Sequence, residues 1–205
     1  MQKTLIYLYK LQKHLLLLLF SRFWSLYARF LFYLNGVKHG DCLHALGSFR
    51  VNVALSGKFT IGDNFHFRSY SKYSDTGDNR PCKFLVGKNS NLNIGNNVAI
   101  TAVTIVCHNY IIIGDNVKIG GGTTIFDTNF HSTDSSVRKS ESDLKLAIFS
   151  PIVIEEDVFI GTSCIICKGV IIGARSIVAA GSIVTRSIPR DQVWGGNPAK
   201  FIKEV

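Results

Sequence analysis

The sequence predicts an all-β fold, a solenoid of short parallel strands with a helical segment before it and a short extension after it. An aliphatic residue recurs at every sixth position over long stretches, and Gly, Asp or Asn punctuates the repeats. Residues 1–38 lack this repeat and are apolar and basic instead. A period of six fits neither an α-helix, at 3.6 residues per turn, nor one long strand, at two. It fits a coil of three short strands, with one hexapeptide on each face and turns at the polar positions.

The hexapeptide repeat is clearest in the C-terminal half of the chain. Its first position is always aliphatic, and the residue four places later is small or modestly apolar, which puts Cys164 inside the coil. Shorter runs of the same kind begin at Ile61, Ile94 and Ile113. Residues 57–190 are therefore expected to form about six coils, stacked at the ~4.8 Å spacing of neighbouring strands. The repeat positions in the clearest run are Ile154, Ile160, Ile166, Ile172, Val178 and Val184.

Interruptions of the hexapeptide repeat indicate where loops and segment boundaries lie. One residue is extra between Val106 and Ile113, and residues 73–84 carry no repeat, so a loop or distorted coil is expected there. Residues 132–151 form the largest interruption, and a polar excursion of that length from a compact coil is typical of a functional loop or a disordered one; the neighbouring His131 favours the functional loop. The expected organisation is a helical segment, a coil domain and an extension, at residues 1–38, 57–190 and 191–205.

The charge pattern argues against nucleic acid as a partner. The net charge is +9, but residues 1–40 hold six basic and no acidic side chains, so the rest of the chain carries only +3. The five cysteines are odd in number and irregularly spaced, which does not make a disulfide framework. Cys164 and Cys167 form a CxxC pair without a second pair or histidines at zinc spacing, so we expect no metal site. Reduced thiols indicate a cytoplasmic location.

The N-terminal segment has the pattern of an amphipathic helix. Its longest stretch free of charge and histidine, residues 15–21, is far shorter than the roughly 20 residues that span a bilayer, and no convincing signal-peptide cleavage site follows. At about 100° per residue, basic side chains fall on one half of the helical wheel, and Leu and aromatic side chains crowd the other. Residues 1–34 are therefore expected to lie on an anionic membrane surface. The alternative is a helix, or two, packed on the domain or on a partner subunit and ending at Asn35 and Gly36.

The repeat and the C-terminal stretch VWGGNPAKFIKEV (193–205) resemble the hexapeptide-repeat family of left-handed β-helix acyltransferases, and the resemblance covers residues 57–205. It implies a left-handed coil, a homotrimer, and acetyl-CoA as the co-substrate in the groove between two subunits. Arg186 stands where the family usually has Lys, and either cation can meet a CoA phosphate. The positions that match the family's CoA site are Gly161, Thr162, Ala179, Ala180, Thr185, Arg186 and Lys200.

The segment IFDTNFHSTD (125–134) resembles the catalytic segment of the sugar and polysaccharide O-acetyltransferases of this family. His131 matches the family's general base, and a neutral imidazole can accept the proton of a hydroxyl group that attacks a thioester. Asp127 and Asn129 would orient His131 or bind the acceptor, although both also suit turns. The alternative for His131 is a structural role inside the coil, where both ring nitrogens would need partners. Substrate-binding positions are expected at His108, Asn109 and Arg138.

The resemblance implies an O-acetyltransferase that moves the acetyl group of acetyl-CoA directly to a sugar hydroxyl, with longer acyl donors left open. The basic, apolar N-terminus favours a surface glycan or its lipid-linked precursor as the acceptor, at the inner face of the cytoplasmic membrane. A small-sugar or xenobiotic acetyltransferase is the alternative on the same fold, but it leaves residues 1–34 without a purpose. A zinc enzyme of the carbonic anhydrase type would need three histidines per site, and those of the coil are dispersed. A non-catalytic scaffold would not need the polar cluster around His131.

Overall fold

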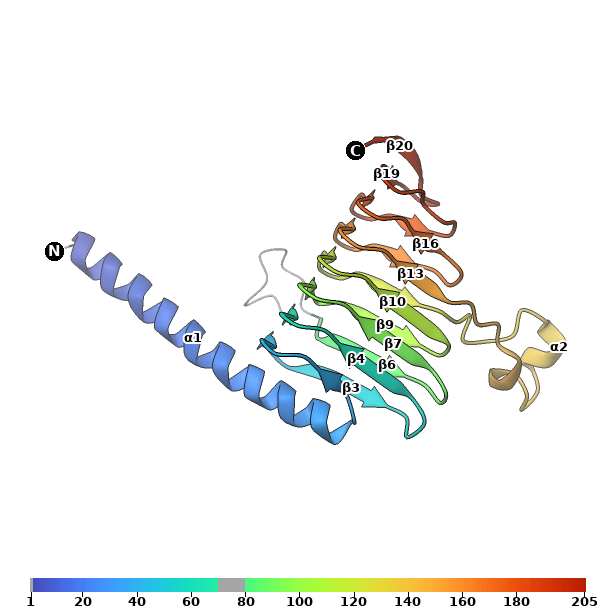
Figure 1. Cartoon of the computed structure of the whole chain (residues 1–205), viewed down its shortest axis with the longest axis horizontal. Coiled ribbons are helices and arrows are strands. Elements are labelled where there is room, and N and C mark those ends of the chain that lie inside the picture. Colours follow the sequence, from blue (N-terminus) through green and yellow to red (C-terminus); the bar gives the residue numbers. More distant parts are fainter. Residues whose placement is uncertain (1, 70–79) are drawn as a thin grey trace.

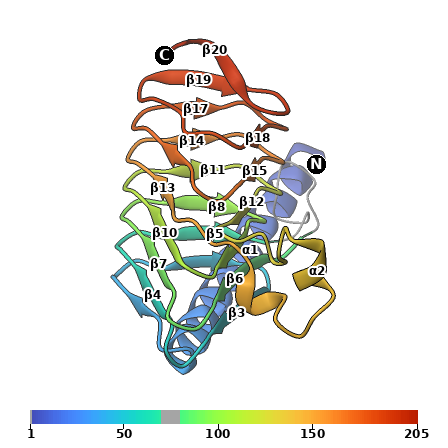
Figure 2. The same cartoon turned by 90° about the vertical axis from the view of Figure 1, so that its right-hand side faces the viewer.

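Short parallel strands in three sheets form the faces of a prism, and a long helix crosses its base (Figures 1 and 2). The structure is a computed structural model that describes residues 2–69 and 80–205. The first face consists of β1 (Lys38–His39), β4 (Lys58–Ile61), β7 (Asn91–Ile94), β10 (Tyr110–Ile113), β13 (Ile152–Ile154) and β16 (Ile171–Ile172). The second face begins with β2 (His44–Leu46), β5 (His66–Arg68), β8 (Ala99–Thr101), β11 (Lys118–Ile119), β14 (Phe159–Ile160) and β17 (Ile177–Val178). The third face consists of β3 (Phe49–Val53), β6 (Cys82–Val86), β9 (Thr104–Cys107), β12 (Thr124–Phe126), β15 (Ile165–Ile166) and β18 (Ile183–Val184).

The hexapeptide repeat builds the interior of the prism. On the first face, Ile113 pairs with Ile94 on one side and with Ile154 on the other, so the repeat positions of successive coils lie over one another. These side chains are almost wholly removed from water, at most 3% exposed, and each buried aliphatic side chain contributes about 1.5–3 kcal/mol to folding. Cys164 is also fully buried, as expected for its position in the repeat.

A ladder of asparagine side chains holds one corner of successive coils. Asn64, Asn97 and Asn116 all adopt left-handed φ values of 55° to 61°, a conformation that asparagine tolerates better than most residues. The amide of Asn64 donates to the side-chain oxygen of Asn97 at 3.0 Å, and Asn97 donates to Asn116 at 3.1 Å. The Asn and Asp that punctuate the repeat therefore turn each coil and tie it to the next.

The coil domain begins earlier than the expected boundary at residue 57, because β1, β2 and β3 already form a complete coil. The pairing with the next coil shows that its repeat positions hold His39, Ala45 and Val51. Because the first two are not large aliphatic residues, the period of six is not visible in this part of the sequence. The loop or distorted coil expected over residues 73–84 is corrected at its end, where Cys82–Val86 forms the regular strand β6; residues 73–79 lie outside the described part of the chain.

The register expected near Val106 is also corrected. Ile105, rather than Val106, pairs with Ile125 of the next coil, so the repeat spacing is five residues before Ile105 and eight after it. A tight turn at Ala102, with φ +49°, shortens the first interval. The longer second interval contains His108, and the corner formed there is part of the candidate site.

The helix α1 (Gln2–Leu34) closes the base of the prism with the C-terminal part of its length. Ala28 and Phe32 are fully buried. The ring of Phe32 lies 5.5–6.2 Å, between ring centroids, from the rings of four other phenylalanines. They belong to the first two coils and are Phe49, Phe59, Phe67 and Phe84. The side-chain amide of Asn35 donates to the carbonyl of Leu31 at 2.9 Å, and the left-handed Gly36 then ends the helix.

We expect Phe32→Ala to lower the free energy of unfolding by about 3–5 kcal/mol, because it leaves a cavity at the open end of the core. Phe30→Ala is the matched control, since its ring is 57% exposed on the same helix, and it should change stability by less than about 1 kcal/mol. Urea unfolding of both variants measures the difference. Equal stabilities would show that α1 does not close the prism.

The opposite end of the prism is closed by the C-terminal segment. Strand β19 (Gln192–Gly195) pairs in parallel with β17, and β20 (Lys200–Glu204) folds back on β19 in antiparallel orientation. This hairpin continues the second face by two strands, so residues 191–205 form a lid of the coil domain.

Candidate active site

The candidate site lies at the corner where the chain passes from the third face to the first, which we call corner 3–1. Strands β9 and β12 both end there, in successive coils. The carboxylate of Asp127 is fully buried and accepts two backbone hydrogen bonds, each at 2.7 Å, from the N–H groups of His108 and Asn109. Asp127 thus ties the longer corner of one coil to the next, and the orienting contact to His131 comes from a different residue.

Asp127 also contributes to the raised pKa of the neighbouring Cys107. Burial, together with the neighbouring charge of Asp127, raises the pKa of the Cys107 thiol to about 12. Cys107 is therefore a protonated packing residue at neutral pH, and it supplies no nucleophile to this corner.

The largest interruption of the repeat leaves the prism at this corner as a compact arm, residues 132–149 (Figures 1 and 2). It contains the short helices α2 (Ser135–Arg138) and η2 (Leu144–Leu146). The base of the arm is fixed to the prism by an antiparallel bridge between Thr128 and Phe149. The N–H of Asn129 donates to the carbonyl of Ile148 at 3.1 Å across the same base, so the backbone of Asn129 helps to pin the arm. A fixed base gives the side chains of the arm a defined position over the corner.

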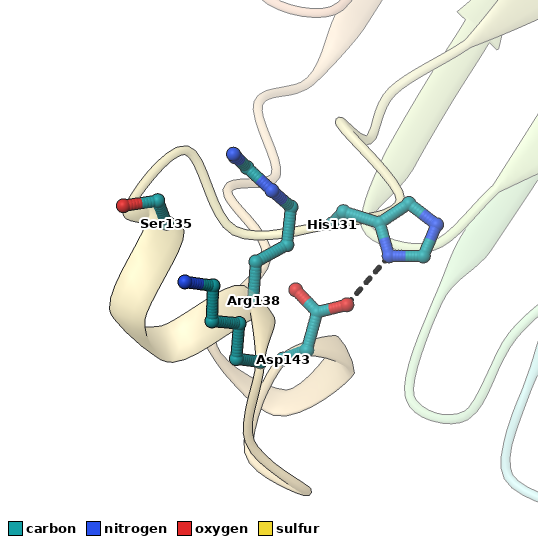
Figure 3. Close-up of a pocket in the computed structure, with 5 residues that line it drawn as sticks. His131, Ser135, Arg138 and Asp143 are labelled. Atoms are coloured by element: carbon teal, nitrogen blue, oxygen red, sulfur yellow. Dashed lines mark hydrogen bonds and ion pairs between the residues drawn. The ribbon is translucent and has the colours of Figure 1, made fainter.

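The arm supplies the partner of His131. His131 Nδ1 lies 2.6 Å from Asp143 Oδ2, and the other oxygen of Asp143 accepts the backbone N–H of Ser132 at 2.8 Å (Figure 3). The His131 side chain is 61% exposed, whereas that of Asp143 is only 14% exposed. The largely buried carboxylate of Asp143 therefore hydrogen-bonds both to the ring of His131 and to the backbone of the next residue.

The charge of Asp143 fixes the tautomer of the imidazole. The hydrogen bonds from His131 and from the Ser132 N–H hold the pKa of Asp143 below its usual value, so its carboxylate is ionised at neutral pH. An ionised carboxylate only accepts hydrogen bonds, so in the neutral imidazole the proton lies on Nδ1 and Nε2 has a free lone pair. Because the folded pKa is depressed, the contact stabilises the arm above the unfolded carboxyl pKa of about 3.9, and this is lost as pH falls through the folded value.

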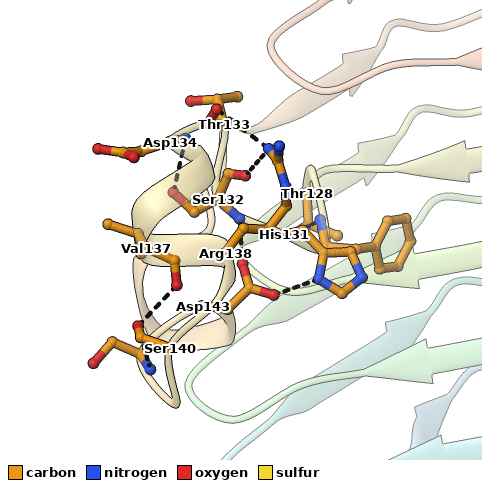
Figure 4. A network of polar contacts seen from close by, with 11 residues as sticks. Thr128, His131, Ser132, Thr133, Asp134, Val137, Arg138, Ser140 and Asp143 are labelled. Atoms are coloured by element: carbon orange, nitrogen blue, oxygen red, sulfur yellow. Dashed lines mark hydrogen bonds and ion pairs between the residues drawn. The ribbon is translucent and has the colours of Figure 1, made fainter.

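Arg138 hydrogen-bonds to the backbone that follows His131. Its Nη1 donates to the carbonyls of Ser132 and Thr133, at 2.9 and 3.3 Å (Figure 4). Asp134 caps α2 by accepting the Ser136 N–H at 2.8 Å. An open depression of about 380 Å³ lies here, lined by His131, Ser135, Arg138, Lys139 and Asp143. Figure 3 shows that the second ring nitrogen of His131 points away from Asp143 and Arg138, so this depression adjoins the Nδ1 side and not the basic nitrogen.

An aromatic edge borders the histidine and was not expected from the sequence. The ring of His108 stacks on Phe149, with centroids 6.1 Å apart and planes at 2°, and meets Phe130 edge to face at 6.5 Å. Phe130 directly precedes His131 and has a left-handed φ of 61°, which is unfavourable for a large side chain. Its ring is nevertheless 42% exposed. Strained residues of this kind concentrate at functional sites.

The residues expected to bind CoA lie at two different corners of the prism. Thr185 and Arg186 follow β18 at corner 3–1, two coils beyond His131, and both are exposed. The other expected residues gather where the chain passes from the second face to the third, which we call corner 2–3. They are Gly161 and Thr162 after β14, Ala179 and Ala180 after β17, and Lys200, which pairs with Gly195 above Ala179.

Gly161 has a structural explanation of its own. A Cβ atom at this position would lie 2.5 Å from the backbone nitrogen of Ala180 in the next coil. The stacking of coils therefore requires glycine here, just as it does at Gly62 and Gly95. Gly161 belongs to corner 2–3 because of the fold, and it adds no separate support for a CoA site.

Comparisons with known proteins agree with this architecture. The family pattern described as the hexapeptide repeat of succinyl-transferase matches residues 151–186. A solved hexapeptide-repeat containing acetyltransferase from Vibrio cholerae is 30% identical, covers 82% of this chain and 73% of its own, and superposes with a TM-score of 0.52. The chain belongs to the hexapeptide-repeat acetyltransferase family. Its all-β, left-handed parallel β-helix, expected from the resemblance, is thereby confirmed.

Two curated members of the family show how far the similarity extends. Galactoside O-acetyltransferase of Escherichia coli (strain K12) is 38% identical over 117 residues, which are 57% of this chain and 55% of that enzyme. A 2,3,4,5-tetrahydropyridine-2,6-dicarboxylate N-acetyltransferase of Staphylococcus aureus (strain JH9) is 50% identical over 56 residues, 27% of this chain and 23% of that one. The chain thus spans about half of the first relative and about a quarter of the second.

The fold alone is shared with a more distant structure. The N-acyltransferase AntD of Bacillus cereus, solved with dTDP-4-amino-4,6-dideoxyglucose and coenzyme A, is 19% identical to this chain. The match covers 82% of both chains with a TM-score of 0.63.

Proposed function

We propose that this family member transfers an acetyl group from acetyl-CoA to a hydroxyl of a sugar in a surface glycan or its lipid-linked precursor. The observation that carries the proposal is the His131–Asp143 pair. Its 2.6 Å contact engages Nδ1 and leaves Nε2 free, on an exposed side chain next to a fixed corner of the prism. Within the described residues, no hydrogen bond engages that nitrogen, as a general base requires.

His131 serves as the general base in the proposed reaction. As the acceptor oxygen bonds to the thioester carbonyl carbon, its proton moves to Nε2, while Asp143 stabilises the positive charge that develops on the ring. A backbone N–H of a neighbouring coil turn donates to the oxyanion. The C–S bond then breaks, and the proton on Nε2 passes to the CoA thiolate. Acyl transfer is thus direct, and no residue of the chain is acylated.

The acceptor is proposed to be a sugar for two reasons. The E. coli relative is named for galactoside O-acetylation, and its match to this chain is the longer of the two curated ones. The aromatic edge formed by His108, Phe130 and Phe149 offers flat apolar faces against which the C–H face of a pyranose ring can stack. In this proposal, the side-chain amides of Asn109 and Asn129 at the same corner recognise hydroxyls of the acceptor. A glycan precursor would be met at the inner face of the cytoplasmic membrane.

We propose a homotrimer, because one chain does not bring all the expected CoA residues to one place. Arg186 belongs to the same corner as His131, whereas Ala180 and Lys200 belong to corner 2–3. Packing corner 3–1 of one subunit against corner 2–3 of its neighbour would complete a groove with His131 at one end. Small residues at Ala179 and Ala180 would let the extended arm of CoA approach the backbone closely.

In this groove, Arg186→Ala or Lys200→Ala should raise the KM for acetyl-CoA about tenfold, since a hydrogen bond between charged groups is worth about 1.5–3 kcal/mol. The kcat should remain within about threefold. Arg190→Ala is the control, because Arg190 is a basic residue four positions after Arg186 that pairs with Asp191 instead. Steady-state thiol release gives both constants. An active monomer in mass photometry would contradict the shared site.

The proposed reaction is tested by release of free CoA thiol from acetyl-CoA over a panel of acceptors. The panel contains neutral hexosides, acidic sugars, a lipid-linked oligosaccharide, and amino sugars with the same ring. Hydroxyl-only sugars should be acetylated at rates well above hydrolysis of acetyl-CoA. Transfer to amino sugars alone would replace the proposal with N-acetylation.

A further inference from the structure

The helix α1 holds the prism with only one of its sides. The buried side chains of Ala28 and Phe32 lie on this side, and the hydroxyl of Ser25 accepts the backbone N–H of Ala45 at 3.0 Å. At about 100° per residue, these three positions fall within roughly 60° of the helical wheel. The residues that continue the same arc toward the N-terminus are Lys3, Tyr7, Lys10, His14 and Ser21. This narrow arc therefore carries mostly polar and basic residues where the helix extends beyond the prism (Figure 1).

The opposite side of α1 carries a set of large apolar residues, interrupted by Gln12, that faces away from the prism. Their side chains are 44–68% exposed along the whole helix, including the part that closes the prism. Soluble proteins rarely expose apolar surface over such a length without a partner. We call this set the outer stripe: Leu5, Leu8, Leu16, Leu19, Phe23, Leu26, Phe30 and Leu34.

The charged residues of α1 indicate which kind of partner the outer stripe binds. Lys13 lies at one border of the outer stripe, and Arg22 and Arg29 lie at the other. No acidic residue occurs in residues 1–40. Basic side chains that flank an apolar stripe match the boundary between anionic headgroups and acyl chains.

We infer that α1 lies flat in the interface of an anionic lipid membrane. The outer stripe enters the acyl region, the flanking basic side chains meet the headgroups, and the prism stays on the aqueous side of the helix. The proposal depends on the geometry of α1 and not on acetyl transfer, so either can fail without the other. It adds a defined docking surface and orientation to the proposed function.

The packing of Phe32 argues against a membrane-spanning α1. A window of this helix does have the length and composition of a span, with a mean hydropathy of 1.5. That window is 11% buried, which corresponds to Ala28 and Phe32, the two residues that α1 buries in the prism. Inserting it across a bilayer would pull Phe32 out of the aromatic core. A second copy of the chain is also disfavoured as the partner, because the charged side chains that flank two facing outer stripes would all be basic and would repel one another.

Two matched double substitutions in the full-length protein test the proposal. Leu8→Glu with Leu19→Glu places two charges on the outer stripe. Ile6→Glu with Leu17→Glu places the same charges, at the same spacing, on the prism-facing half of the helix. All four side chains are exposed, and none lies in the part of α1 that closes the prism. Binding is measured by flotation with vesicles of phosphatidylcholine and phosphatidylglycerol, and with vesicles of phosphatidylcholine alone.

The wild-type protein should float with the anionic vesicles and much less with the neutral ones. The outer-stripe pair should lower the partition coefficient about tenfold or more, and the control pair by less than about threefold. Equal losses from both pairs, or no flotation of the wild type, would overturn the proposal. So would resistance to alkaline carbonate extraction, which indicates a span. A smaller oligomer for the outer-stripe pair, without vesicles, would assign the stripe to subunit packing instead.

Discussion

Replacing His131 with alanine is expected to lower kcat/KM for acetyl transfer by roughly 10²–10⁴, the usual range for the loss of a general base. In the proposed reaction Nε2 of His131 accepts the proton of the acceptor hydroxyl, and the exposed side chain contributes little to packing. Folding and oligomeric state should therefore not change. Thiol release with a hydroxyl acceptor measures the rate, and circular dichroism and mass photometry establish that the variant is intact.

The control for His131→Ala is His66→Ala. His66 is an exposed histidine on the second face, bonded to Asn64 and stacked on His44, away from corner 3–1. Its removal should leave kcat/KM within about threefold. If His131→Ala is equally mild, another group accepts the proton.

Replacing Asp143 with asparagine is expected to lower kcat roughly 10–10³-fold, with the KM for acetyl-CoA within about twofold. The amide removes the charge that stabilises the imidazolium, and its N–H₂ can donate to Nδ1 and so select the wrong tautomer. Among the described residues, the carboxylate of Asp143 hydrogen-bonds to His131 and Ser132, so the proposed role of Asp143 is to position the base. Asp143→Glu should recover part of the loss, because it restores the charge.

Asp134→Asn is the control within the same arm. Asp134 is also an acidic residue with a depressed pKa, caused first by the hydrogen bond from the Ser136 hydroxyl, but it caps α2 and does not touch the ring. It should change kcat by less than about threefold. Equal losses of kcat in Asp143→Asn and Asp134→Asn would mean that activity depends on the folding of the arm, and not on the hydrogen bond between the Asp143 carboxylate and the imidazole.

The regular part of the fold was predictable from the sequence because each hexapeptide carries its own signal. An aliphatic residue at every sixth position specifies an inward side chain in every coil, as Ile154 and Ile160 illustrate. The first coil was not predicted because His39 and Ala45, which are not large aliphatic residues, occupy its repeat positions. Phe32 of α1 fills the core at this end instead. The strand at Cys82–Val86 was missed because no punctuated repeat precedes it.

The candidate site was only partly predictable. His131 was found because the repeat stops beside it, and the same reasoning assigned its orientation to nearby Asp127. The structure gives that contact to Asp143, which is twelve residues away in an arm without periodicity. The orientation of a side chain across such an arm depends on its backbone path, which the local sequence does not encode. The exposed Phe130, on a left-handed backbone, lacked any signal in the repeat.

The most direct test of the central claim is to identify the product formed from acetyl-CoA and a hydroxyl acceptor, with wild-type protein and with His131→Gln. Mass spectrometry and NMR of the acceptor detect a new acetyl ester and its position on the sugar ring. We predict an O-acetyl ester formed in step with CoA release by the wild type, and at least about 100-fold less ester with His131→Gln. Ester formation at equal rates by both proteins, or the absence of ester on every hydroxyl acceptor, would contradict the account.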